Sequence, residues 1–156
     1  MVIHYTAGAS SAAGRAKEMK SSWEKSKKAS ADFGVDDATM VQFNPDPSSY
    51  YCWAVGGGNG ITNANSISIE ICSNLKPGTS ASKPNHEGWY YTEASLNNAV
   101  KLAKILMKKY NIPVERVVRH YDVTGKLCPG IIGWNDGKIY TASGSSTDKK
   151  NNSLKW

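Results

Sequence analysis

Apolar residues along this chain recur with the periods of both strands and helices. Residues 66–72 alternate strictly, with Ile67, Ile69 and Ile71 on one face and polar or small side chains on the other. This alternation predicts a strand that turns one face toward the core. The polar side chains of the other face are then available for a different purpose.

Residues 93–110 carry apolar side chains at spacings of three and four, which predicts a helix. Thr92 precedes it as an N-cap, and Asn111 and Pro113 follow it as stop signals. The stripe that we expect to be buried consists of Leu96, Ala99, Val100, Ala103, Leu106, Met107 and Tyr110.

Shorter β-branched and aromatic runs predict the remaining strands. They lie at residues 2–6, 31–35, 39–43 and within 114–120. The middle two resemble a hairpin. A further helix should follow a cap at Ser10 or Ser11, with apolar positions at Ala12, Ala16, Met19 and Trp23. Because helices alternate with strands, we predict an α/β fold with a mixed central β-sheet flanked by α-helices.

A length of 156 residues suits a single domain with a real core. From Thr141 onward Ser, Thr, Asn, Asp, Gly and Lys predominate, so we expect the domain to occupy residues 1–140 and a linker-like polar tail to occupy 141–156. No apolar run approaches membrane-spanning length, and no signal-peptide pattern opens the chain. Neither membrane insertion nor a signal peptide is therefore predicted.

The net charge of +6 and a pI near 9.2 favour a polyanionic partner. Nucleic acid and an anionic cell-wall polymer both fit, and charge alone does not separate them. Three cysteines argue against a disulfide framework. Cys52 and Cys72 lie in apolar surroundings and are interpreted as small buried residues, whereas Cys128 lies in a Gly/Lys/Pro segment that suggests an exposed loop.

The segment from His120 to Cys128 holds two of the best zinc ligands, separated by seven residues. We expect residues 120–130 to form a loop that brings both onto one ion, with His4 as a third ligand from the first strand. Three protein ligands with an open fourth position describe a catalytic zinc site. The alternative is two hydrogen-bonded structural histidines. The remaining histidine, His86, lies in a polar loop and is expected to be solvated.

Two charged residues are candidates for the chemistry of such a site. Glu70 interrupts an isoleucine-rich strand, where a carboxylate is costly to bury unless it is paired or faces a polar cleft. It could transfer a proton from water to a leaving group, or it could be an edge-strand residue in solvent. Lys126 would lie close to any metal bound by Cys128 and could stabilise an oxyanion, or it could be an ordinary surface lysine.

Two further residues are assigned as substrate contacts. Trp53, beside the glycine-rich residues 56–60, could stack on a sugar or pack in the core. Asp122 lies two residues after His120. Its alternatives to a substrate contact are to orient a metal ligand or to cap its own loop.

Taken together, these segments resemble the zinc-dependent N-acetylmuramoyl-L-alanine amidases of the type-2 amidase and peptidoglycan-recognition-protein family, which occur as phage endolysins and bacterial autolysins. The matching segments occur in the order of the family. They are residues 2–7, 30–37, 53–57, 66–72 and 119–129. The last of them, Arg-His-Tyr-Asp-Val-Thr-Gly-Lys-Leu-Cys-Pro, is the most specific.

The resemblance implies a peptidoglycan hydrolase that uses zinc-activated water to cleave the amide between N-acetylmuramic acid and L-alanine. It assigns His4, His120 and Cys128 as zinc ligands, Glu70 as the catalytic glutamate and Lys126 as the lysine near the metal. The expected partner is the anionic cell wall outside the cell, with no nucleic acid, and the protein is expected to be a monomer.

The chain also departs from the family pattern. Ala31 stands where some members have a tyrosine, Asp32 where many have a histidine, and Ala54 where a histidine can follow the tryptophan. None of these positions is a zinc ligand, so the departures concern substrate contacts. A family segment before the first strand is not seen, and the polar tail suggests a wall-binding domain beyond it.

Three rival functions remain open from the sequence. A non-catalytic peptidoglycan receptor would need neither Cys128 nor Glu70. A basic nucleic-acid-binding domain with a structural zinc would need a fourth ligand nearby, and none is evident. A peptidoglycan hydrolase of another specificity, an endopeptidase or a glycosidase, is the third.

Overall fold

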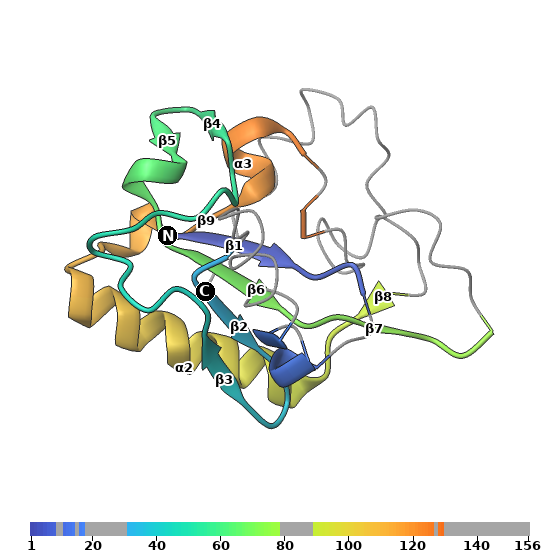
Figure 1. The fold of residues 1–156 in the computed structure, drawn as a ribbon. Helices are drawn as coiled ribbons and strands as arrows, with labels where there is room; N and C mark the ends of the chain where they lie inside the picture. The colour runs from blue at the N-terminus through green and yellow to red at the C-terminus, as the bar shows by residue number, and fades with distance from the viewer. Residues whose placement is uncertain (9–10, 15, 18–30, 79–88, 127, 130–156) are drawn as a thin grey trace.

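The computed structural model describes residues 1–8, 11–14, 16–17, 31–78, 89–126 and 128–129. Their centre is a five-stranded sheet with the order β3-β2-β6-β1-β9 (Figure 1). Its strands are β1 (Val2–Tyr5), β2 (Phe33–Val35), β3 (Met40–Gln42), β6 (Ser68–Ile71) and β9 (Val118–Arg119). β1, β2, β6 and β9 run parallel, and β3 is antiparallel to β2. The predicted mixed sheet and hairpin are confirmed.

One face of this sheet forms the main core, and helix α2 (Glu93–Tyr110) covers it (Figure 1). Ile69 and Ile71 of β6 point into it, as their alternation predicts. The core also contains Met1, Ile3, Phe33, Val35, Ala99, Leu102, Ala103 and Leu106. No helix in the described part of the chain is long and apolar enough to cross a membrane.

Helix α2 has the predicted ends. The Ser95 backbone N–H donates to Thr92 Oγ1 at 3.1 Å, and Asn111 adopts a left-handed conformation with φ of 53°. Its buried stripe is centred on Ala99, Leu102 and Leu106, so the prediction was wrong for Leu96, which is 39% exposed. Leu96 lies at the margin of the stripe, where the adjoining Ser95 is buried instead.

The opposite face of the sheet is supported by a short helix and a small hairpin (Figure 1). Helix α3 spans His120–Thr124, and strands β4 (Gly57–Gly58) and β5 (Ile61–Thr62) form the hairpin. At Gly58 an added Cβ would lie 2.2 Å from the Val123 carbonyl oxygen, so only glycine allows this close approach. The Asn59 side-chain amide also donates to the Asp122 carbonyl at 2.7 Å. The hairpin thus holds α3 in place.

The remaining described elements are short. They are the 3₁₀ turns η1 (Asn63–Asn65) and η2 (Val114–Arg116) and the paired strands β7 (Asn74–Leu75) and β8 (Trp89–Tyr90). Residues 12–14 and 16–17 are helical, and the Gly14 N–H donates to Ser11 Oγ at 3.1 Å, as a cap there requires. The predicted positions Met19 and Trp23, His86, and the tail from 141 lie outside the described residues.

A buried carboxylate connects the second strand to its neighbours. Asp32 accepts hydrogen bonds from the Ser68 N–H at 2.8 Å and Ser68 Oγ at 2.9 Å, both at the start of β6. It also accepts from Asn44 Nδ2 at 2.7 Å and from Cys52 Sγ at 3.3 Å. Because the carboxylate is 2% exposed, these donors replace its water shell. Cys52 and Cys72 are both buried, as predicted.

Replacing Asp32 should therefore destabilise the fold. Asp32→Ala leaves buried donors on Ser68 and Asn44 without an acceptor, and we expect the free energy of unfolding to fall by about 3 kcal/mol. Chemical denaturation measures this change. The exposed Asp37→Ala is the control and should alter stability by less than about 0.5 kcal/mol. Equal stabilities of the two variants would contradict the role given to Asp32.

Candidate metal centre

Three neighbouring parallel strands bring the candidate residues into one row. His4 of β1 lies opposite Glu70 of β6 in the register, and Ile3 lies opposite Arg119 of β9. His120 directly follows Arg119, so it lies next to His4 on the side of β1 that is away from Glu70. Paired residues of adjacent strands are about 4.8 Å apart and point to the same face. The carboxyl ends of the strands therefore place Glu70, His4 and His120 on the face opposite helix α2.

The turn that carries His120 is fixed by an ion pair between the buried Arg119 and the exposed Asp122. Asp122 accepts from the Arg119 backbone N–H at 2.8 Å and from Arg119 Nε at 2.9 Å, and it also bonds Arg119 Nη2. This capping starts α3 at His120, so the expected loop over 120–130 begins instead as a helix. These contacts match the loop-capping alternative for Asp122. Whether Asp122 also contacts substrate stays a prediction.

His4 lies at distances from the other two candidate ligands that suit one zinc ion. His4 Nδ1 lies 3.1 Å from His120 Nδ1 and 3.6 Å from Cys128 Sγ, and the ligand atoms of all three residues lie within 4.8 Å of one another. Tetrahedral zinc with ordinary bond lengths separates two nitrogens by about 3.3 Å and a nitrogen from a sulfur by about 3.6 Å. The donor set and its geometry fit zinc.

Both histidines are held neutral, which is the form that binds metal. Burial lowers the pKa of His4 to about 3, helped by the charges of His120 and Lys126. Burial and the Lys126 charge likewise lower the pKa of His120 to about 4, against the opposing effect of its hydrogen bond to the Val55 backbone. That bond orients the His120 ring from outside the ligand set.

Cys128 is only 4% exposed, so the expectation of an exposed cysteine was wrong. The loop folds back beneath α3, and the Tyr121 N–H donates to the Cys128 carbonyl at 3.0 Å. Burial, followed by the Glu70 charge, raises the pKa of the Cys128 thiol to about 12. A thiol in this position gives up its proton only to a strong competing cation.

Glu70 and Lys126 both lie within electrostatic reach of the candidate ligands. Glu70 is half-buried on β6, an interior strand flanked by β1 and β2, which rules out the edge-strand alternative. One of its carboxylate oxygens is buried. Lys126 is exposed, and its charge lowers the pKa of His4 and His120, so it lies within electrostatic reach of both imidazoles.

Trp53 is 61% exposed, which rules out the alternative that it packs in the core. Its ring centroid lies 6.4 Å from that of Tyr51, which is also exposed. The two rings are tilted by 41° to each other and offer an exposed aromatic surface of the kind that binds the face of a sugar ring. Contact with substrate stays a prediction.

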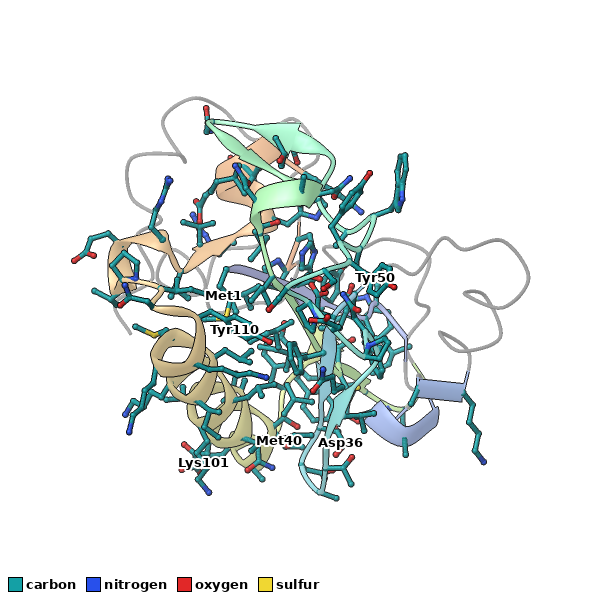
Figure 2. All side chains as sticks on the ribbon, turned by 60° about the vertical axis from the view of Figure 1, so that its left-hand side comes forward. Met1, Asp36, Met40, Tyr50, Lys101 and Tyr110 are labelled. Atoms are coloured by element: carbon teal, nitrogen blue, oxygen red, sulfur yellow. The ribbon has the colours of Figure 1, made fainter. Side chains whose placement is uncertain are left out.

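A cavity of about 390 Å³ lies away from this centre. Its lining includes Met1 at the amino end of β1, Tyr110 at the end of α2, Tyr50 and Arg116. Met1, Tyr50 and Tyr110 are labelled in Figure 2. His4 lies at the carboxyl end of the same strand. The metal centre and the cavity are therefore separate features.

Sequence reasoning missed two residues that touch the centre. Val55 acts through its backbone, a group that every position offers, so no sequence signal identifies it. Tyr91 follows strand β8 and packs against the cluster formed by Tyr5, Trp89 and Cys128. Its aromatic ring fits the apolar pattern of a core residue, so the sequence does not distinguish it from one.

A family profile described as N-acetylmuramoyl-L-alanine amidase matches residues 1–131. The chain is 39% identical to the N-acetylmuramoyl-L-alanine amidase CwlH of Bacillus subtilis over 98 residues, which are 62% of this chain and 33% of CwlH. It is 32% identical to CwlA of the same species over 130 residues, 83% of this chain and 42% of CwlA. The chain thus spans less than half the length of these relatives.

Solved structures are similar over the same region. The structure of PlyL superposes with a TM-score of 0.61 at 32% identity, covering 83% of this chain and 71% of that one. The catalytic domain of XlyA gives a TM-score of 0.60 at 31% identity, covering 83% of this chain and 74% of that one.

The ligand geometry predicts that the protein binds one zinc ion. Cys128→Ser replaces a thiolate by a hydroxyl and should weaken zinc affinity by about tenfold or more. Competition with a chromophoric chelator measures the affinity. His86→Ala removes the histidine that is not among the candidate ligands and should bind zinc as the original chain does. Equal affinity of the Cys128→Ser variant would remove Cys128 from the ligand set.

The protonation states predict how zinc binding depends on pH. The thiol pKa is about 12, and the imidazole pKa values are about 3 and about 4. Near neutrality, Cys128 is therefore the one of these three groups that must lose a proton before it can bind zinc. Binding should release about one proton, so zinc affinity should rise about tenfold for each unit increase in pH between about 6 and about 8. Calorimetry in buffers of different ionisation enthalpy counts the proton. A count of zero would contradict this assignment.

Proposed function

The chain belongs to the N-acetylmuramoyl-L-alanine amidase family, and from this premise we propose that it hydrolyses the amide between N-acetylmuramic acid and L-alanine in peptidoglycan. The observation that carries the proposal is the row of Glu70, His4 and His120 across three strands, closed by Cys128. This arrangement supports a three-ligand zinc site with a carboxylate beside it. A structural zinc site would be closed by a fourth protein ligand.

The chemistry that zinc supplies when bound there is polarisation of the scissile carbonyl and a lower pKa for the attacking water. His4, His120 and Cys128 would hold it. Burial keeps the two imidazoles neutral and able to coordinate, and the Val55 backbone orients the His120 ring.

Glu70 would carry the proton. Its place next to His4 in the register puts a carboxylate within a strand spacing of the ligand set, on the same face of the sheet. From there it can accept a proton from the attacking water and then deliver it to the leaving amine of L-alanine. One oxygen of this carboxylate is buried and therefore shielded from solvent.

Lys126 would stabilise the oxyanion that forms on the substrate carbonyl. Gly125 ends α3 with φ of 77°, and Lys126 follows at the open side of the centre. A lysine ammonium at this position opposes negative charge as it develops. Its exposure leaves it free to approach a substrate that binds from solvent.

The substrate would lie along the exposed side of the centre. Trp53 and Tyr51 offer an exposed aromatic surface for the sugar, and Asp122 is an exposed polar group two residues after His120. The net charge of +6 favours an anionic wall polymer. We propose that the protein acts on the cell wall outside the cell as a monomer, with neither nucleic acid nor membrane as a partner.

Glu70→Gln tests the proton-transfer role. The amide keeps the size of the side chain but accepts no proton, so hydrolysis of purified cell wall should fall by about 10² to 10⁴-fold while zinc affinity is retained. The decrease in turbidity of a wall suspension measures the rate. Glu93→Gln, at the exposed start of α2, is the matched control and should hydrolyse as before. Full activity of Glu70→Gln would defeat the assignment.

The new chain ends formed in the digest separate the rival functions. New amino-terminal L-alanine without new reducing sugars supports the amidase. Reducing sugars would indicate a glycosidase, and other amino termini an endopeptidase. Binding to the wall without any cleavage would indicate a receptor and would overturn the proposal.

A further inference from the structure

Tyr91 is held rigidly beside the candidate metal centre. It lies between strand β8 and the Thr92 cap of helix α2. Its ring packs against both the main core and the smaller cluster of Tyr5, Trp89 and Cys128. A side chain packed against two clusters has little freedom to turn its hydroxyl elsewhere.

The Tyr91 hydroxyl oxygen is buried and has no hydrogen-bond partner among the residues that the structure describes. A buried hydroxyl without a partner is unfavourable, and folded proteins rarely retain one without a reason. Apolar packing alone would be served as well by phenylalanine. The oxygen therefore requires an explanation.

The packing and the nearby charges connect the Tyr91 hydroxyl to the candidate metal centre. Burial and then the negative charges of Cys128 and Glu70 raise the pKa of Tyr91, with smaller effects from Tyr5 and Cys72. The Cys128 side chain belongs to the cluster against which the Tyr91 ring packs. The hydroxyl is thus within electrostatic reach of Cys128, on a ring that contacts its cluster.

We infer that Tyr91 is a positioning residue of the metal centre, whose hydroxyl donates a hydrogen bond to the Cys128 thiolate when that thiolate binds zinc. This inference rests on the proposed zinc site. A neutral thiol is a weak acceptor, whereas a ligating thiolate has lone pairs and negative charge to offer. Metal loading therefore creates the partner that the hydroxyl otherwise lacks.

Such a bond would hold the sulfur at the correct place and moderate its charge. Cys128 comes from a segment that returns to the sheet after helix α3, so its side chain depends on neighbours for its direction. Groups that hydrogen-bond to ligands commonly change metal affinity by about 10 to 100-fold. Tyr91 would act on zinc through Cys128 and would not touch the substrate.

Tyr91→Phe in the full chain tests this role, because it removes only the hydroxyl oxygen. We expect zinc affinity, measured by chelator competition, to fall by about tenfold. With cobalt(II) in place of zinc, the thiolate-to-metal charge-transfer band should shift to lower energy, because the sulfur regains the electron density that the hydrogen bond withdrew. Tyr90→Phe, on the neighbouring exposed ring, should change neither quantity.

Thermal unfolding separates positioning from a structural role. Without metal the Tyr91→Phe variant should be at least as stable as the original chain, since it loses an unsatisfied hydroxyl. With zinc it should be stabilised less than the original chain. A residue that acts only in packing would lower the stability of both forms equally.

Two results would overturn the inference, and they are distinguishable. If the original chain binds zinc and Tyr91→Phe binds it equally well with an unchanged cobalt band, the inference fails while the proposed metal centre stands. If the original chain binds no zinc, the metal centre itself fails, and the inference fails with it.

Discussion

Two parallel pairings, β1 with β6 and β1 with β9, place a carboxylate and two imidazoles side by side at the carboxyl ends of these strands. Side chains alternate between faces along a strand, so a slip of one residue in either pairing would exchange polar residues for core residues. The same register that directs Ile3 and Ile69 toward helix α2 directs His4 and Glu70 away from it. Core packing and site geometry are therefore specified together.

The site combines groups that are unfavourable to bury separately. His4, His120 and Cys128 are all nearly inaccessible to solvent, and burial favours the uncharged form of each. Supporting contacts come from outside the row: Arg119 and Asp122 start helix α3, and the β4–β5 hairpin holds that helix down through Gly58. These contacts hold helix α3, and with it His120, against the sheet.

Local patterns allowed the sequence to predict β6 and helix α2 with both its ends, and residue chemistry with the family resemblance identified the cluster of His4, His120 and Cys128. The burial of Cys128 could not be predicted, because it depends on a fold-back onto residues far away in the chain. The helix at His120 was missed because its cap is an Arg119–Asp122 pair rather than a common capping residue. Tyr91 was missed because its ring fits an apolar pattern and only its hydroxyl has a further role.

The candidate ligands are far apart along the chain: His4 and Cys128 are separated by 124 residues, nearly the full span over which the structure describes residues. An ion bound by both would close that span into a single loop and act as a cross-link between its two ends. Closing so long a loop removes much of the conformational entropy of the unfolded chain. Resistance of the protein to proteolysis would then depend on the same ion as the proposed reaction.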